Sequence, residues 1–243
     1  MLYSIVIPAH NEEDCIKDTV ITIITRLTEE KITHEILIVN DNSTDGTVKL
    51  IEQLMAKYST LRYVNNSPPN GYGMAVRKGL QEFKGDAVAV VMADGSDSPD
   101  DIVSFYRKLE EGFDCVFGSR FIKSGKLFDY PYMKLFLNRL GNNFISMLFR
   151  IRYNDVTNAF KCYKRKVIEG IQPLLSQHFE LTVEMPLKAI VRGFSYAVLP
   201  NTWTNRQKGV AKFKIKELGS KYFYMIFYIW LEKHFLIRQR KQK

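Results

Sequence analysis

The chain has 243 residues, of which 46% are hydrophobic, and a formal net charge of +9. This length fits one large domain, and the hydrophobic share supplies a core, which excludes wholesale disorder. A basic surface favours nucleic acid, anionic lipid or phosphorylated ligands. The sequence has no zinc-finger, RNP or basic-zipper pattern, so we do not expect nucleic acid as the partner. Three scattered cysteines suit a reducing compartment and give neither a disulfide framework nor a metal-ligand spacing.

The first 120 residues alternate between expected strands and helices. Strands are expected at residues 2–8, 35–39, 61–64, 88–93 and 114–118. Helices with apolar residues at helical spacing are expected at 16–27, 48–55 and 100–111, with a glycine-rich helix entry at 70–80. This alternation predicts βαβ units and therefore an α/β fold, a mostly parallel sheet flanked by helices.

Polar side chains crowd the ends of two of these strands. The apolar run 88–93 ends at Asp94, Ser96 and Asp97. Two carboxylates and a hydroxyl are hard oxygen ligands for Mg²⁺ or Mn²⁺, and ligands of open α/β sheets bind beyond the carboxyl ends of the strands. The same residues are equally typical of a strand end followed by a helix cap. A second polar cluster at 40–47 follows the strand 35–39 and is expected to face the same crevice.

The second half of the chain predicts helices at 132–151, 179–192 and 214–237, a strand at 193–199 and a basic loop at 205–212. We expect the apolar positions of helix 132–151 to be buried in the core, with membrane-surface contact as the lesser alternative. The helix 214–237 contains a run of ten apolar residues, too short to span a bilayer. Its aromatic residues and the basic tail 238–243 suit the headgroup region, although packing on the domain or on a dimer partner explains it equally.

Seven motifs in one order link the chain to a family. They are residues 6–13 (VIPAHNEE), 39–47 (VNDNSTDGT), 70–75 (NGYGMA), 85–86 (GD), 118–120 (GSR), 155–160 (DVTNAF) and 206–212 (RQKGVAK). With these motifs the chain resembles family-2 glycosyltransferases of the GT-A fold, which have a Rossmann-like nucleotide-sugar-binding sheet. Among them it is similar to the polyprenyl- or dolichyl-phosphate sugar synthases (dolichol-phosphate mannosyltransferase-like).

The resemblance implies roles for individual residues. The nucleotide base and ribose would be held by Pro8, His10, Glu12, Val39 and Asp41. The D-A-D element of the family corresponds to Met92, Ala93 and Asp94, so Asp94 is the expected metal ligand and the first aspartate is missing. Ser96 stands where the family often has a metal-binding glutamine, and Asp97 is a candidate to complete the metal site. The donor and acceptor phosphates would be held by Arg120, Lys134, Arg206 and Lys212.

The implied activity is inverting transfer of a sugar from a nucleotide-sugar (GDP-mannose or UDP-hexose) to a polyprenyl or dolichyl phosphate, with Mg²⁺ or Mn²⁺. We expect a catalytic domain at 1–213 and an amphipathic helix with a basic tail at 214–243, peripheral on the cytoplasmic face of a membrane. Two alternatives stay open: a family-2 transferase that glycosylates a hydroxyl acceptor, and a non-catalytic nucleotide-sugar-binding protein, suggested by Met92. A homo-oligomer also stays open.

Overall fold

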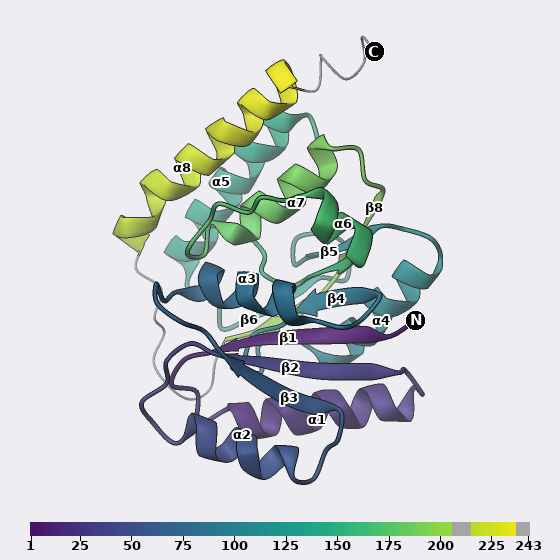
Figure 1. The fold of residues 1–243 in the computed structure, drawn as a ribbon. Coiled ribbons are helices and arrows are strands. Elements are labelled where there is room, and N and C mark those ends of the chain that lie inside the picture. Colours follow the sequence, from purple (N-terminus) through teal and green to yellow (C-terminus); the bar gives the residue numbers. More distant parts are fainter. Residues whose placement is uncertain (206–214, 237–243) are drawn as a thin grey trace.

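The computed structural model describes residues 1–205 and 215–236, and a seven-stranded sheet forms its centre (Figure 1). The strand order is β3-β2-β1-β4-β7-β5-β8. Among these strands β7 runs antiparallel to both of its neighbours, and the other pairs are parallel. The strands are β1 (Tyr3–Ala9), β2 (His34–Asn40), β3 (Leu61–Asn65), β4 (Ala87–Val90), β5 (Cys115–Ser119), β7 (Lys161–Lys164) and β8 (Tyr196–Pro200).

Alternate residues of the central strands enter two separate cores, one on each face of the sheet. In β1, Ile5 and Ile7 belong to one core and Val6 to the other. In β4, Ala89 and Val90 divide in the same way. A strand covered on both faces needs apolar side chains at nearly every position, which explains the continuous apolar runs in the sequence.

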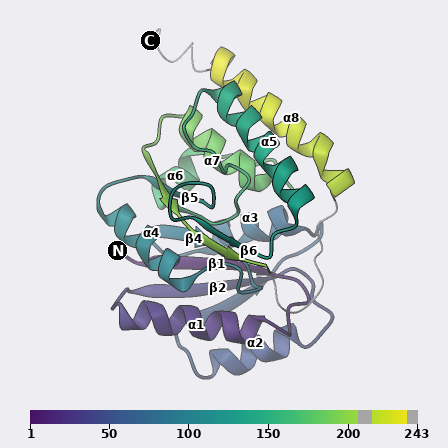
Figure 2. The same ribbon diagram turned by 180° about the vertical axis from the view of Figure 1, so that it is seen from behind.

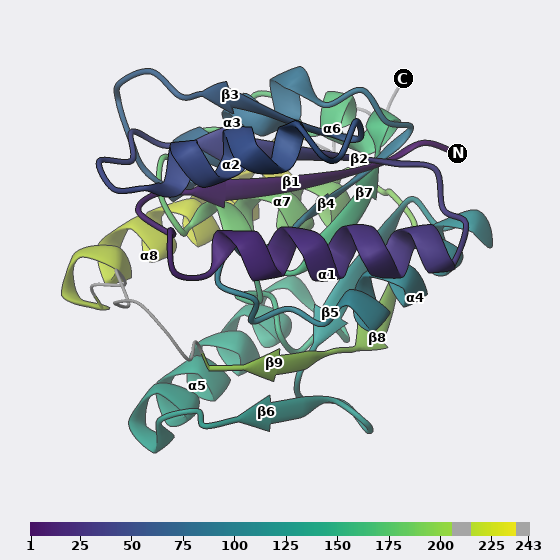
Figure 3. The same cartoon turned by 90° about the horizontal axis from the view of Figure 1, so that it is seen from below.

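Helices cover both faces of the sheet, so the molecule has three layers (Figures 1 and 3). On one face lie α1 (Ile16–Glu29), α2 (Thr47–Met55) and α4 (Pro99–Glu110). The opposite core receives side chains from α3 (Tyr72–Glu82), α5 (Tyr132–Phe149), α6 (Arg165–Gly170), α7 (Leu181–Val191) and α8 (Ile215–Leu231). The expected α/β fold with a mostly parallel, helix-flanked sheet is therefore confirmed.

Three short features were not expected from the sequence. They are the helix α6, the antiparallel direction of β7, and a separate two-stranded sheet of β6 (Lys126–Phe128) and β9 (Thr202–Thr204). Strands of three residues are too short to show a repeating apolar pattern. The small sheet lies next to the start of α5 (Figure 3).

The expectation that the apolar residues of α5 are buried in the core is wrong. The fully buried positions of this helix are Asn142, Ile145 and Phe149, whereas Met133 is 72% exposed and Phe136 is 64% exposed. Helix α5 packs on the domain through the three buried residues in its C-terminal half. The regularly spaced apolar residues lie on the opposite, exposed side of the helix. The remaining exposed apolar residues of α5 are Tyr132, Leu137, Leu140, Phe144 and Met147.

Helix α8 packs on the domain with one side and exposes the other. Its Met225, Ile226 and Ile229 join the same core as α3 and α7. Its outer residues Phe223 and Tyr224 are exposed. The helix is continued by a π-helical turn (Glu232–Leu236), where Lys233 donates a hydrogen bond to the carbonyl of the last α5 residue at 2.6 Å. Helices α5 and α8 lie side by side (Figures 1 and 2).

Candidate active site at the carboxyl edge of the sheet

The carboxyl ends of the parallel strands meet at one edge of the sheet. Asp41 donates its backbone N–H to the carbonyl of Ala9, so β1 and β2 end level. Strand β4 ends opposite Val6, and Val91 donates to the carbonyl of Val6, so the segment after β4 begins beside the last residues of β1. Because β5 runs parallel to β4, its last residue Ser119 reaches the same edge, and antiparallel β7 begins there. The residues that follow β1, β2, β4 and β5 and those that precede β7 are therefore neighbours.

Hydrogen bonds join the segments that follow β1 and β2. His10 Nδ1 lies 2.7 Å from the carbonyl oxygen of Asp41, and the backbone N–H of Glu12 donates to Thr47 Oγ1 at 2.8 Å. The Asp41 carboxylate accepts from Asn66 Nδ2 at 2.7 Å and from the Gly71 N–H at 2.9 Å. This carboxylate thus holds the segment that leads from β3 into α3.

The other residues expected around the nucleotide differ in what they present. The side chains of Val39 and Ala93 are buried, so they lie beneath the surface of this edge. Pro8 and Met92 are partly exposed. The structure brings Pro8, His10, Val39 and Asp41 together at adjacent strand ends, with Met92 and Ala93 after the next strand.

The acidic segment after β4 forms a tight turn. Asp94 is partly exposed, and its Oδ1 accepts the backbone N–H of Ser96 at 3.1 Å. Asp97 is buried, and its Oδ2 accepts the N–H of Met92 at 3.0 Å. Burial, with a smaller contribution from Asp94, raises the pKa of Asp97 to about 7. Asp97 therefore closes the turn from inside, while Asp94 lies on its outer side.

The turn suits a divalent cation with few protein ligands. Within residues 1–205 and 215–236, no three His, Cys, Asp or Glu side chains gather at metal-binding distance. The Ser96 hydroxyl, however, is buried and has no hydrogen-bond partner within the described part of the chain. One carboxylate and one hydroxyl fit a hard cation that keeps waters and substrate phosphate oxygens as its other ligands. Within the expected set, Asp94 and Asp97 each use one oxygen to accept a backbone N–H of the turn, and the assignment of Asp94, Ser96 and Asp97 as metal ligands stays a prediction.

A buried ion pair stands at the end of β5. Arg120 donates through Nε and Nη2 to the two oxygens of Asp155, at 2.8 and 2.7 Å, and its backbone N–H donates to the same carboxylate at 2.9 Å. Burial alone lowers the pKa of Arg120, but the Asp155 carboxylate overrides it and raises that pKa above its ordinary value. Arg120 is only 8% exposed, and the Asp155 carboxylate compensates its charge.

The cations Arg120 and Lys134 lie against aromatic rings at this edge of the sheet. The Arg120 guanidinium lies 5.7 Å from the ring centre of Tyr130, and Lys134 Nζ lies 5.2 Å from the same ring and 5.9 Å from that of Trp203. Burial and the nearby Arg120 lower the pKa of Lys134, whereas Asp94 acts in the opposite direction. Lys134 thus lies between the acidic turn and Arg120.

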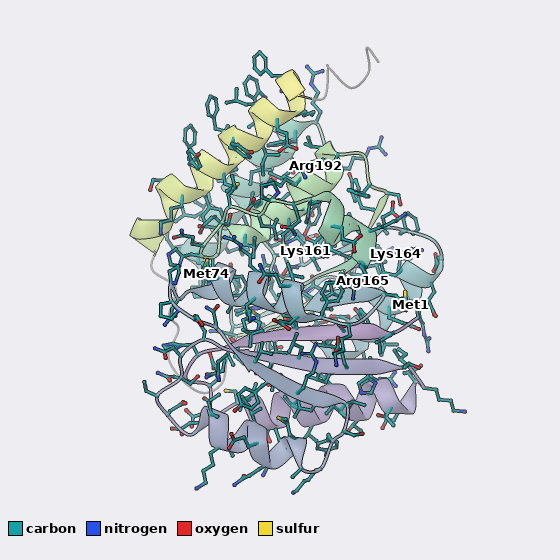
Figure 4. All side chains as sticks on the ribbon, viewed as in Figure 1. Met1, Met74, Lys161, Lys164, Arg165 and Arg192 are labelled. Carbon is teal, nitrogen blue, oxygen red and sulfur yellow. The ribbon has the colours of Figure 1, made fainter. Side chains whose placement is uncertain are left out.

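Polar contacts fix the segment that carries Asp155. Thr157 receives hydrogen bonds on its hydroxyl from Asn138 and Asn142 of α5 and donates its N–H to Asn142. Lys161, which follows in β7, is buried between the sheet and the helices above it (Figure 4). Its ammonium donates to the carbonyls of residues 156, 158 and 182, which ties the segment to α7.

The sequence thus predicted the residues at the strand ends but not the residues that contact them. Asp155 lay in a recognised motif but without a role, and Tyr130 and Trp203 carried no signal beyond being aromatic residues near basic ones. Arg206 and Lys212 lie outside the described residues.

Comparisons with known proteins agree with this architecture. The chain is 28% identical over 231 residues to polyprenol monophosphomannose synthase of Mycolicibacterium smegmatis, covering 88% of this chain and 86% of that protein. It is 32% identical over 171 residues to an uncharacterized glycosyltransferase of Synechocystis, covering 70% of this chain and 52% of that protein, so the matched part is about half the length of this relative.

Solved structures share the fold. Glucosyl-3-phosphoglycerate synthase of Mycobacterium tuberculosis in complex with phosphoglyceric acid superposes with a TM-score of 0.69 at 17% identity, covering 96% of this chain and 79% of that one. A complex of the same enzyme with Mn²⁺, UDP and glucosyl-3-phosphoglycerate gives a TM-score of 0.69 at 18% identity, with the same coverage.

The family assignment comes from the sequence itself. The model of the family described as Glycosyl transferase family 2 matches residues 4–171. This range holds the strand ends, the acidic turn and the Arg120–Asp155 pair described above. The protein therefore belongs to glycosyl transferase family 2 and is a glycosyltransferase.

Proposed function

We propose that the protein transfers a sugar, with inversion, from a nucleotide-sugar to a polyprenyl phosphate. One observation carries the proposal: Lys134 shares the Tyr130 ring with Arg120 and is close enough to Asp94 for that charge to act on it, at the base of a helix whose outer side is apolar and exposed. This arrangement suits two phosphate groups and a hydrocarbon chain. The similarity to the mycobacterial synthase along most of the chain supports the same acceptor class.

The chemistry requires charge compensation more than proton transfer. The bond from the anomeric carbon to the donor's diphosphate breaks, and an oxygen of the acceptor phosphate forms the new bond on the opposite face of the sugar. A phosphate monoester has a second pKa of about 6, so it is largely ionised at neutral pH and needs no strong base. Cations placed by the protein stabilise the charge on the leaving diphosphate and reduce the repulsion between donor and acceptor.

The contacts of two acidic residues, Glu180 and Glu184, support a phosphate acceptor over a hydroxyl acceptor, because a hydroxyl acceptor needs a base. Glu184 is fully buried and accepts from the N–H groups of Leu175 and Ser176 and from Lys188. Glu180 accepts from two backbone N–H groups of the same segment through one oxygen. Both side chains hold the 175–178 segment. The other oxygen of Glu180 has no hydrogen-bond partner among the described residues but is shielded from solvent, so neither carboxylate is open to an acceptor hydroxyl.

A divalent cation is part of the proposal. Mg²⁺ or Mn²⁺ held by Asp94 and Ser96 would neutralise the donor's diphosphate. The missing carboxylate at Met92 leaves coordination positions for the phosphate oxygens and water.

We also propose that the exposed apolar residues of α5 and α8 rest on a membrane surface. No helix within the described residues is long and apolar enough to cross a bilayer. Amphipathic helices of this kind lie in the headgroup region, and a net charge of +9 favours anionic lipid. In this proposal residues 1–213 provide the catalytic domain, and α8 contributes its inner side to the core and its outer side to the membrane.

The test is a two-stage assay. Thermal shifts with UDP-, GDP- and dTDP-sugars, each with and without Mn²⁺, identify the donor, because a ligand of the native state raises the melting temperature. Transfer from that donor is then measured to geranyl phosphate and to geraniol. We expect metal-dependent transfer to the phosphate alone. Transfer to the alcohol would favour a hydroxyl acceptor, and binding without any transfer would favour a non-catalytic role.

A further inference from the structure

One arginine of α5 has a buried nitrogen without a partner. The Nη1 atom of Arg139 is shielded from solvent and makes no hydrogen bond within the described part of the chain. None of the ion pairs among the described residues involves Arg139. A buried guanidinium donor that lacks an acceptor is energetically unfavourable. An anion bound beside Arg139 would supply that acceptor.

An aromatic ring places Arg139 next to Arg120. Its guanidinium carbon lies 4.5 Å from the ring centre of Phe121, and that of Arg120 lies 5.3 Å from the same ring. Two guanidinium groups against one ring repel each other unless negative charge offsets them. Asp155 does this for Arg120, and Arg139 has no equivalent carboxylate in the described residues.

The place of Arg139 on the helix indicates which anion it meets. Residues three apart lie on neighbouring positions of a helix surface. Arg139 is three residues after Phe136, which is 64% exposed, and three before Asn142, which is fully buried. Arg139 therefore lies at the boundary between the interior of the site and the apolar outer side of α5. An anion bound there can extend a hydrocarbon chain directly along that side.

We propose that Arg139 binds the phosphate of the lipid acceptor, with the acceptor's chain following the apolar side of α5. This rests on the proposed function, because the acceptor class comes from it. Arg120, held by Asp155, then supports the site from inside, and Arg139 offers a guanidinium nitrogen that has no acceptor within the described part of the chain. Guanidinium groups suit this role because two parallel N–H donors match two phosphate oxygens.

Binding of geranyl phosphate, measured by calorimetry without vesicles, tests the proposal independently of transfer. Arg139→Met should weaken geranyl phosphate binding about 10- to 100-fold, the loss expected for one charge-assisted hydrogen-bonding group. Arg139→Lys, which keeps the charge on Phe121, should bind with intermediate affinity. Arg152→Met, an equal charge change at an exposed position beyond the helix, should bind as the wild type does. Binding of geraniol, and of UDP or GDP with Mn²⁺, should not change in any variant.

Equal geranyl phosphate affinity in the wild type and both Arg139 variants would overturn the proposal, as would a wild type that binds geranyl phosphate no better than geraniol. A melting temperature within about 2 °C of the wild type shows that a variant is folded, and Arg139→Lys keeps the test decisive if Arg139→Met is not. If binding depends on Arg139 but no nucleotide-sugar donates to geranyl phosphate, the acceptor site stands and the proposed reaction fails.

Discussion

Arg120 and Asp155 form a buried ion pair in which one carboxylate accepts three hydrogen bonds from one residue, at 2.7 to 2.9 Å. Asp155 is fully buried. The pair joins the end of β5 to the segment that precedes β7, and these two are neighbours only because β7 enters the sheet in the reverse direction. The antiparallel strand therefore brings the arginine and its counter-charge together.

Replacing Asp155 by Asn should destabilise the protein by about 3–5 kcal/mol, because Arg120 remains buried without a counter-charge. Urea unfolding with an unchanged m-value measures this. Glu82→Gln serves as the control, since it breaks the partly exposed Lys78–Glu82 pair and should cost less than about 1 kcal/mol. If the two variants lose the same stability, the buried pair behaves like a surface pair and our interpretation of it is wrong.

Asp94→Asn should abolish most transfer, with a loss of at least about 100-fold, while the free energy of unfolding changes little. The amide keeps the Ser96 N–H as a partner but cannot neutralise a cation. Calorimetry with Mn²⁺ in the presence of the donor nucleotide should show weakened metal binding. A variant that keeps its activity and its Mn²⁺ affinity would remove Asp94 from the metal site.

Lys161 should make stability depend on pH. Burial lowers its pKa to about 7 in the folded protein, against about 10.4 when unfolded. Between these values the folded state binds fewer protons than the unfolded state, so stability rises with pH, by at most about 1.4 kcal/mol per unit. This contribution is present at high pH and is lost as the pH falls through about 7.

The measurement is the difference in unfolding free energy between the wild type and Lys161→Met from pH 6 to 10. The free energy of unfolding of the wild type minus that of the variant should increase with rising pH, because only the wild type has the titrating group. The same comparison with Lys17→Met, at an exposed position of α1, should stay flat. A flat difference for Lys161 as well would mean that its pKa is not lowered.

Gly73→Ala should cost about 1–3 kcal/mol, because α3 approaches the 176–178 segment too closely for a side chain. A Cβ at Gly73 would lie 2.6 Å from the carbonyl carbon of Gln177, and Met74 donates its N–H to the oxygen of that carbonyl at 3.1 Å. Gly141→Ala in α5 is the matched control: a Cβ there meets nothing within 4 Å, so alanine should stabilise the helix by about 0.5–1 kcal/mol. Equal effects at the two glycines would refute the packing argument.

The sequence predicts part of the fold and of the candidate site, but not the tertiary contacts of the site residues. The strand-helix alternation and the residues that follow β1, β2, β4 and β5 were predictable, because apolar periodicity and strand-end chemistry are local signals. The partners were not: Asp155 meets Arg120 through tertiary structure alone. Sequence spacing groups Asp97 with Asp94 as a candidate metal ligand, but it cannot show that one oxygen of Asp97 accepts the Met92 N–H.

The error on α5 has a different cause. A periodic apolar stripe reports that one side of a helix avoids water, and core, partner and membrane all satisfy it. The polar Asn142 is the buried position here because it bonds Thr157, whereas Met133 and Phe136 are exposed. Only the packing of α5 against the domain distinguishes the two sides.

The exposed residues Met147 of α5 and Phe223 of α8 should contribute to membrane binding. Met147 is 73% exposed and Phe223 is 64% exposed, so replacing both by Ser should leave the melting temperature unchanged. Each side chain loses about 1.5–3 kcal/mol of burial in the bilayer interface, so binding to vesicles should weaken at least about 100-fold in total. Co-sedimentation with vesicles of phosphatidylglycerol and phosphatidylcholine measures this.

The control carries the same number of changes elsewhere. Met55 of α2 and Leu175 are also exposed apolar residues but belong to neither α5 nor α8, and the double Ser variant should sediment as the wild type does. Both double variants keep Arg139, so each should still bind geranyl phosphate more tightly than geraniol in solution. If both variants lose vesicle binding equally, or neither does, the outer sides of α5 and α8 are not the surface that meets the membrane.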